Sequence, residues 1–111
     1  KTKRGINQML YLMLQKGDNE YLAKVGYTAD THKRRSVYHS HNPRAIMRSS
    51  CSGQVKQESA CHSHLHLASV ERVGGTEWYI VSKEVFDQLY EKGMGFFRPN
   101  HKPIHFLEDF K

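Results

Sequence analysis

The sequence has few cysteines, prolines and tryptophans, and it has no long apolar segment. Its 111 residues include two cysteines, three prolines and one tryptophan. Cys51 and Cys61 could form a disulfide, but nothing marks the protein as secreted, so we expect two reduced thiols. Apolar runs stay well below the roughly 20 residues that span a bilayer. No apolar stretch follows the basic residues 1–5, as it would in a secretory signal. We therefore expect no association with a membrane.

Positive charge is in excess. Lysine and arginine number 17 against 11 aspartates and glutamates, which gives a formal net charge of +6. A basic domain favours a polyanionic partner, although a small interaction domain can also carry such a charge incidentally. The basic side chains crowd the middle third of the chain, where they are Lys33, Arg34, Arg35, Arg44 and Arg48.

The N-terminal third has the pattern of a β-hairpin. Residues 9–14 are apolar apart from one tyrosine, which is typical of a strand buried on both faces. Gly17, Asp18 and Asn19 form a turn signal, and residues 21–27 read as a second strand. We expect the two strands to pair antiparallel.

Helices and strands then alternate. Asp30 or Thr31 can cap the first helix, and Ser82 can cap the last, which Gly93 stops. The predicted elements are a helix over residues 32–40, a strand over 45–51, a helix over 54–68, a strand over 77–81 and a helix over 83–92. This order predicts an α+β fold with a small mixed or antiparallel central β-sheet flanked by helices.

We expect residues 1–111 to form one domain, with a core over residues 9–92. Residues 93–111 then form a C-terminal extension that carries two prolines. We predict a loop and a short terminal segment there. Four aromatic side chains should pack this extension, namely Phe96, Phe97, Phe106 and Phe110.

Tyr11 and Lys24 are polar groups in otherwise apolar strands. Paired strands can bring a phenol and an ammonium together, and a nearby positive charge lowers the pKa of a tyrosine. Such a phenol could take a proton from water. The alternative is that Tyr11 is a core residue with a satisfied hydroxyl, while Lys24 extends to the surface. These two residues alone favour the alternative.

Two helical pairs also stand out. Arg34 and Tyr38 are four residues apart, so they share a helix face that suits a phosphate group. Glu58 and His62 have the same spacing, and a carboxylate is a plausible ligand for a hard cation such as Mg²⁺. Each pair taken alone is better explained by a solvated helix surface.

The order of these residues resembles the GIY-YIG nuclease superfamily, and within it the T5orf172 branch. The resemblance covers roughly residues 9–81. The first family tripeptide corresponds to residues 9–11, where only Tyr11 is kept, and the second to residues 24–26 with Lys24 in place of the usual tyrosine. The later matches are Tyr27 and Thr28, Arg34, Tyr38, Asn42 and Pro43, Glu58, His62, and Gly75 to Tyr79 with Glu77 and Trp78.

The resemblance implies a metal-dependent DNA endonuclease. Glu58 would hold one Mg²⁺ or Mn²⁺ ion, with His62 supporting it. Tyr11 would act as general base with help from Lys24, and Arg34 would hold the scissile phosphate. Hydrogen bonds to the phosphate or the attacking water would come from Tyr27 and Tyr38. Further contacts with nucleic acid would come from Lys33, Arg35, Arg44 and Arg48.

Other interpretations remain open. A nucleic-acid-binding module could keep this fold without cleaving, and the domain could be a homodimer or be fused to a further DNA-binding domain. The branch is common in phages and mobile elements, so we expect the cytoplasm of a bacterial or phage-infected cell, or a eukaryotic nucleus. We interpret Trp78 as a core residue. Glu77 could support the active site or pair with a basic residue, and we assign it a structural role. Zinc is disfavoured because alternate residues on a helix diverge. Its candidate ligands are Cys51, Cys61, His62, His64 and His66.

Overall fold

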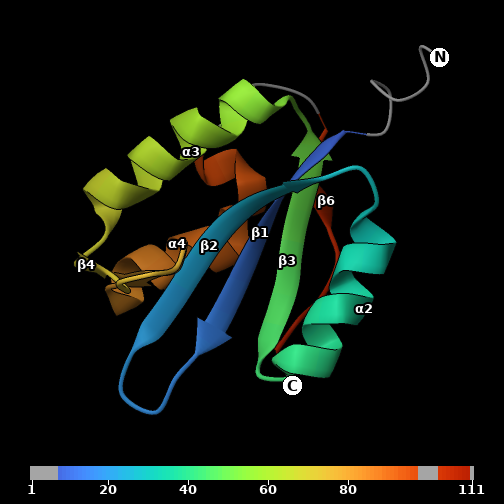
Figure 1. Cartoon of the computed structure of the whole chain (residues 1–111). Helices are drawn as coiled ribbons and strands as arrows, with labels where there is room; N and C mark the ends of the chain where they lie inside the picture. The colour runs from blue at the N-terminus through green and yellow to red at the C-terminus, as the bar shows by residue number, and fades with distance from the viewer. Residues whose placement is uncertain (1–7, 98–102, 111) are drawn as a thin grey trace, which may run out of the picture.

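Six strands form one sheet in the computed structural model, which describes residues 8–97 and 103–110 (Figure 1). The strand order is β4-β5-β2-β1-β3-β6, and each pair of neighbours is antiparallel. The elements are β1 (Met9–Lys16), β2 (Tyr21–Thr28), α2 (Thr31–His41), β3 (Ala45–Ser52), α3 (Val55–Ala68), β4 (Glu71–Arg72), β5 (Tyr79–Val81), α4 (Lys83–Lys92), the 3₁₀ helix η1 (Gly93–Phe96) and β6 (His105–Phe106). The predicted α+β class is confirmed.

Local signals in the sequence account for several element boundaries. The Gly17 amide donates to the Glu20 carbonyl at 2.8 Å and closes the turn of the β1–β2 hairpin. Asp30 caps α2 by accepting from the Lys33 amide, and Ser82 caps α4 by accepting from the Val85 amide. Gly93 ends α4 with φ at +58°, a conformation that favours glycine.

Side chains alternate along each strand, so the sheet divides the core into two clusters. One cluster centres on Leu10, Leu12 and Leu14 of β1 and includes residues of α3, α4 and η1. The other contains Tyr11 and Met13 of β1 with Ala45 and Met47, and Tyr38 and Trp78 pack against it. β1 is therefore buried on both faces, as its apolar run predicts.

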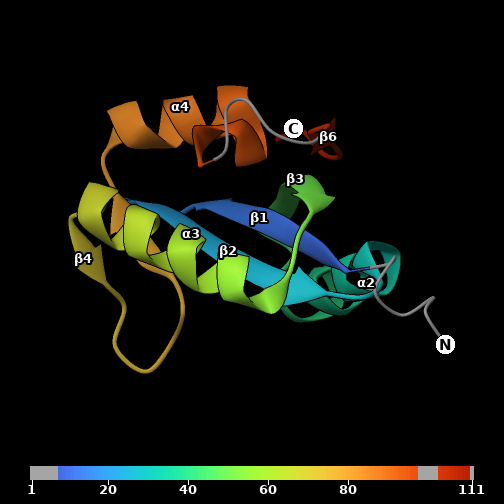
Figure 2. The same ribbon diagram turned by 90° about the horizontal axis from the view of Figure 1, so that it is seen from above.

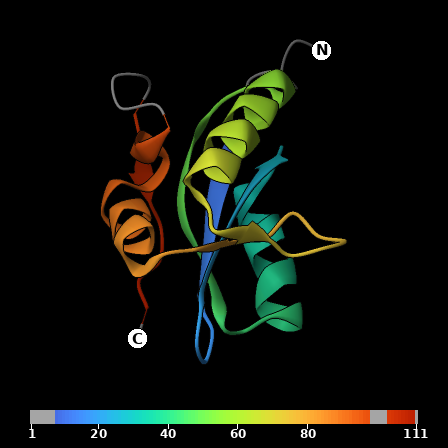
Figure 3. The same ribbon diagram turned by 90° about the vertical axis from the view of Figure 1, so that its left-hand side faces the viewer.

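The helices cover the sheet unequally. Figure 3 shows α4 on one face of the sheet and α2 on the opposite face. In Figure 2, α3 runs alongside β2, and Cys61 and Leu65 are its buried contributions to the α4-side cluster. No helix within the described ranges is long and apolar enough to cross a membrane.

Two parts of the sheet differ from the predicted one. The strand expected over residues 77–81 begins only at Tyr79, because its pairing with β2 begins at the Ala23–Tyr79 pair. The short strands β4 and β6 were not predicted. Each has two residues, too few to show an alternating pattern, and β6 is defined by its distant partner β3.

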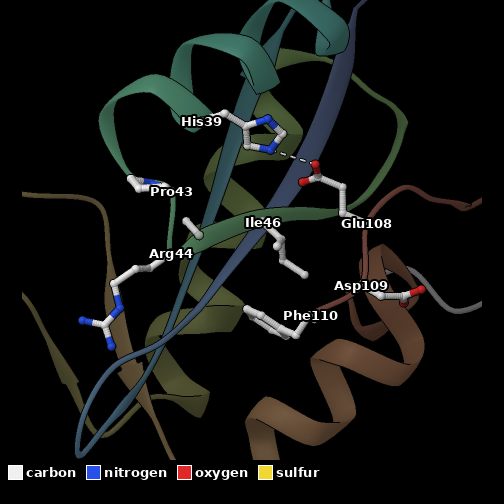
Figure 4. A pocket seen from close by; sticks show the side chains of 8 residues that line it. His39, Pro43, Arg44, Ile46, Glu108, Asp109 and Phe110 are labelled. Atoms are coloured by element: carbon white, nitrogen blue, oxygen red, sulfur yellow. Dashed lines mark ion pairs between the residues drawn. The ribbon is translucent and has the colours of Figure 1, made fainter.

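The C-terminal segment packs beside β3 and contacts the clusters on both faces of the sheet. Leu107 packs against the α2-side cluster, whereas Phe110 packs against the α4-side cluster. The Glu108 carboxylate accepts from the Met47 amide at 2.6 Å and lies 2.8 Å from His39 Nε2, as Figure 4 shows for His39. Three of the four predicted aromatic anchors pack as expected, and Phe106 is half exposed.

The prediction of a single domain over residues 1–111, with a core at 9–92 and an extension at 93–111, also covers residues outside the described ranges. These are residues 1–7, 98–102 and 111.

Candidate active site

Tyr11 lies directly across from Gly26 in the β1–β2 register. Its side chain is 1% exposed, and its ring crosses over the β2 backbone. A Cβ atom placed on Gly26 would lie 2.2 Å from Cζ of Tyr11 and 2.3 Å from its hydroxyl oxygen. Only glycine leaves this space, so Gly26 and Tyr11 form one packing unit.

Helix α2 brings Tyr38 and Arg34 to the Tyr11 phenol. The Tyr11 and Tyr38 rings meet edge to face with their centroids 6.4 Å apart. Burial, followed by Tyr38, raises the pKa of Tyr11 well above its ordinary value, while the Arg34 guanidinium lowers it and Glu77 raises it. The expectation that a neighbouring lysine lowers this pKa is therefore wrong for the protein alone. Burial dominates, and the opposing cation is Arg34.

Lys24 was expected to act beside Tyr11, but its ion-pair partner is Glu77. In the register it pairs with Met13 and not with Tyr11. Its ammonium lies 3.3 Å from Oε1 of Glu77 and 5.3 Å from the Tyr38 ring centroid. The Lys24 side chain is 14% exposed and the Glu77 side chain 49%, so the ion pair crosses from the sheet surface toward solvent.

Glu58, His62 and Glu77 form the group of potential metal ligands that the described residues contain. One ligand atom from each lies within 4.8 Å of the others. The His62 ring nitrogen Nε2 lies 2.7 Å from the Val25 carbonyl oxygen and 3.6 Å from Oε2 of Glu58. Among the described strands, β5 pairs with β2 from Tyr21 to Ala23. Val25 lies beyond this pairing, so its carbonyl oxygen can contact His62.

The sequence allows Glu77 a structural role, support of the active site or a pair with a basic residue. In the structure it pairs with Lys24 and belongs to the cluster with Glu58. Its position depends on the pairing of β5 with β2, because Glu77 lies two residues before Tyr79, the partner of Ala23. In the sequence Glu77 stands beside Trp78, which packs as a core residue as expected.

A depression beside the N-terminus of α2 adjoins this site. It has a volume of about 490 Å³, and its lining includes Tyr27, Thr28, Asp30, Lys33 and Arg34. Tyr27 also packs against the α4-side cluster. Lys33 and Arg34 give the depression two cationic groups, which suits a phosphate backbone.

The other basic residues that we expected to bind nucleic acid have partners within the chain. Arg35 pairs with Glu108 at 3.3 Å, and Arg44 pairs with Asp18 at 3.1 Å. Arg48 donates to the Tyr90 carbonyl at 2.8 Å, and its guanidinium lies over the Tyr90 ring. Their binding to nucleic acid stays a prediction.

The residues considered for zinc lie in separate places. Cys51 and Cys61 are buried in the α4-side cluster. The His64 ring lies 5.1 Å from that of Phe96, and the His66 ring lies 5.8 Å from that of Tyr79. Only His62 of this set belongs to the metal-ligand group found among the described residues.

A family model described as the T5orf172 domain matches residues 8–93. The chain belongs to the T5orf172 domain family. This domain is associated with the GIY-YIG-like nuclease fold, so membership indicates a nuclease-like or DNA-binding module. No curated protein and no solved structure matches the chain. The T5orf172 match ends at Gly93, so the segment that packs beside β3 lies beyond it.

Proposed function

We propose that this T5orf172 domain is a metal-dependent DNA endonuclease that hydrolyses phosphodiester bonds. The observation that carries the proposal is the convergence of two groups from distant parts of the chain. Glu58 and His62 meet Glu77 within 4.8 Å, and the charges of Glu77 and Arg34 both act on Tyr11. Membership of a family associated with nucleases supports this assignment.

The residues present fit a hard divalent cation. Mg²⁺ keeps several waters and binds through one or two carboxylates, and the Glu58 side chain is 19% exposed, so it is accessible to a hydrated ion. Glu58 would hold Mg²⁺ or Mn²⁺, and the bound ion would stabilise negative charge on the leaving 3′ oxygen.

The chain's own residues would bind the phosphate and move the proton. Arg34 lines the basic depression and its charge lowers the pKa of Tyr11; its guanidinium would hold the scissile phosphate. Tyr27 and Tyr38 would donate hydrogen bonds to the phosphate or the attacking water. Tyr11 would accept the water's proton. Its raised pKa makes the phenolate scarce but strongly basic, and Arg34 favours its formation.

The products would be a 5′ phosphate and a 3′ hydroxyl. One site makes one cut, so double-strand cleavage would need a second copy of the domain or a second visit. A further DNA-binding domain on the same protein would supply a DNA target. We place this activity in the cytoplasm of a bacterial or phage-infected cell, or in a eukaryotic nucleus.

A nucleic-acid-binding module without cleavage is the second candidate function. The raised pKa of Tyr11 favours it, because a buried phenol that keeps its proton can serve as a packing group. Under this alternative Arg34 and Lys33 would bind phosphate, and Glu58 would have no catalytic role.

Plasmid cleavage tests the proposal. The protein should nick or linearise supercoiled DNA with Mg²⁺ or Mn²⁺ and should stop when the metal is chelated. Glu58→Gln should abolish cleavage, and Arg34→Ala should slow it about 10²- to 10³-fold, as expected for a lost charge-stabilising donor. Glu84→Gln, at an exposed position in the first turn of α4, is the matched control. Cleavage by Glu58→Gln at the parent rate would refute the assignment.

The same protein samples distinguish the nuclease from a binding module that does not cleave. Steeply salt-dependent binding of DNA without cleavage, under every metal condition, would favour the binding module.

A further inference from the structure

We propose that Glu77 is a second carboxylate of the metal site, and that Lys24 and the metal ion compete for it. This inference rests on the proposed function, because it assumes that Glu58 binds the ion. It adds Glu77 to the metal ligands. It also assigns the Lys24–Glu77 ion pair to the metal-free state of the site.

The hydrogen bond from His62 to Val25 makes the carboxylates the better metal ligands. A carbonyl oxygen can only accept a hydrogen bond, so Nε2 of His62 must donate its proton to Val25 across their 2.7 Å contact. The same nitrogen lies 3.6 Å from Oε2 of Glu58. A protonated nitrogen has no lone pair for a metal ion. Nε2 therefore cannot bind the ion while it donates to Val25, and we assign His62 a positioning role that fixes α3, and with it Glu58, against the edge of β2.

Glu77 is held beside Glu58 by the loop before β5. The Thr76 amide donates to the Val73 carbonyl at 3.2 Å, and the Trp78 amide donates to Oγ1 of Thr76 at 3.1 Å. Trp78 then packs into the α2-side cluster. Glu77 is thus fixed between two anchored neighbours, while half of its side chain remains exposed. A fixed and accessible carboxylate suits a metal ligand better than a mobile surface glutamate does.

Lys24 explains how the site is stable without a metal ion. Two carboxylates close together repel each other, and a largely buried ammonium needs a counter-charge. The Lys24–Glu77 ion pair meets both needs, since its atoms lie 3.3 Å apart. A divalent cation placed between Glu58 and Glu77 would take over the role of Lys24 toward Glu77. The two cations therefore compete for one carboxylate.

This competition predicts effects of opposite sign on metal affinity. Glu77→Gln should weaken binding of Mn²⁺ about tenfold or more, as removal of groups at metal sites commonly does. Lys24→Met should tighten it, because the competing ammonium is gone. In a Glu77→Gln background the gain from Lys24→Met should largely disappear. A purely structural role for either residue would not produce this coupling.

Mn²⁺ titration followed by electron paramagnetic resonance tests the inference on the full chain without DNA. The signal of free Mn²⁺ gives affinities for the parent, Glu58→Gln, Glu77→Gln, Lys24→Met and the Lys24→Met/Glu77→Gln double variant. Glu84→Gln is the control, and circular dichroism melts confirm that each variant folds.

The outcomes separate this inference from the proposed function. Parent-like affinity in Glu77→Gln with weak binding in Glu58→Gln would overturn the role of Glu77 and leave the nuclease proposal standing. Parent-like affinity in Glu58→Gln would remove the basis of both. An equal gain from Lys24→Met with and without Glu77 would overturn the competition.

Discussion

Replacement of Gly26 by alanine tests the packing unit on which the candidate site is built. The new Cβ would lie 2.2 Å from Cζ of Tyr11 and 2.8 Å from its Cε1. The Tyr11 ring is rigid, fully buried and packed edge to face with Tyr38, so it cannot move aside at little cost. Gly26 is not among the described glycines with positive φ, which are Gly75 and Gly93. The strain is therefore steric.

Overpacking of this kind costs about 1–3 kcal/mol of unfolding free energy. Tyr11→Ala alone should cost about 3–5 kcal/mol, as truncation of large buried aromatic residues does. Once Tyr11 is truncated, Gly26→Ala should be neutral or should stabilise by about 0.5–1 kcal/mol, because alanine is less flexible in the unfolded chain. Tyr11→Phe should not relieve the strain, since Cζ remains.

Urea denaturation of the single and double variants measures this coupling. Gly74→Ala is the control, because a Cβ there would meet nothing within 4 Å. Additive effects of Gly26→Ala and Tyr11→Ala, or a Gly26→Ala cost as small as that of Gly74→Ala, would refute the packing argument. The Gly26→Ala variant should also lose cleavage, because Tyr11 must leave its position.

Two further predictions concern pH and the C-terminal segment. Because the folded-state pKa of Tyr11 is raised, its contribution to stability is present below about pH 10, the unfolded value, and is lost as pH rises toward the folded value. Urea midpoints at pH 9 and 11 should therefore fall more for the parent than for Tyr11→Phe, and equal decreases would count against the burial argument. Glu108→Ala should cost about 1–3 kcal/mol, since it leaves the Met47 amide and Arg35 without their carboxylate. A matched Asp87→Ala change on the exposed face of α4 should cost under about 1 kcal/mol, and similar urea midpoints for the two variants would contradict this role of Glu108.

Much of the fold was predictable because its signals are local. The Gly17 turn, the Asp30 and Ser82 caps and the apolar β1 run each act within a few residues. The edges of the sheet were not predictable. β6 has two residues, and its partner β3 is distant in the sequence, so no periodicity could indicate it.

In the candidate site, too, local relations were predictable and distant ones were not. The helical pair Glu58–His62 shares a face and makes a direct contact, as its spacing indicates. The alternative of a core role for Tyr11 is confirmed, whereas the lowered pKa is not, because the register opposes Tyr11 with Gly26 and burial outweighs the nearby charge. Glu77 could not be located without the register between β2 and β5.

The charge of Glu77 connects the proposed metal site to the proposed base. Of the charged groups that act on Tyr11, Arg34 lowers its pKa, whereas Glu77 raises it. A phosphate bound to Arg34 would offset the lowering group, which by itself would make the phenolate scarcer. A cation shared by Glu58 and Glu77 would offset a raising group and act in the opposite direction. With the phosphate bound, a filled metal site would therefore leave Tyr11 better prepared to accept a proton than an empty one. Glu77 would then contribute to proton transfer through its charge while remaining a metal ligand.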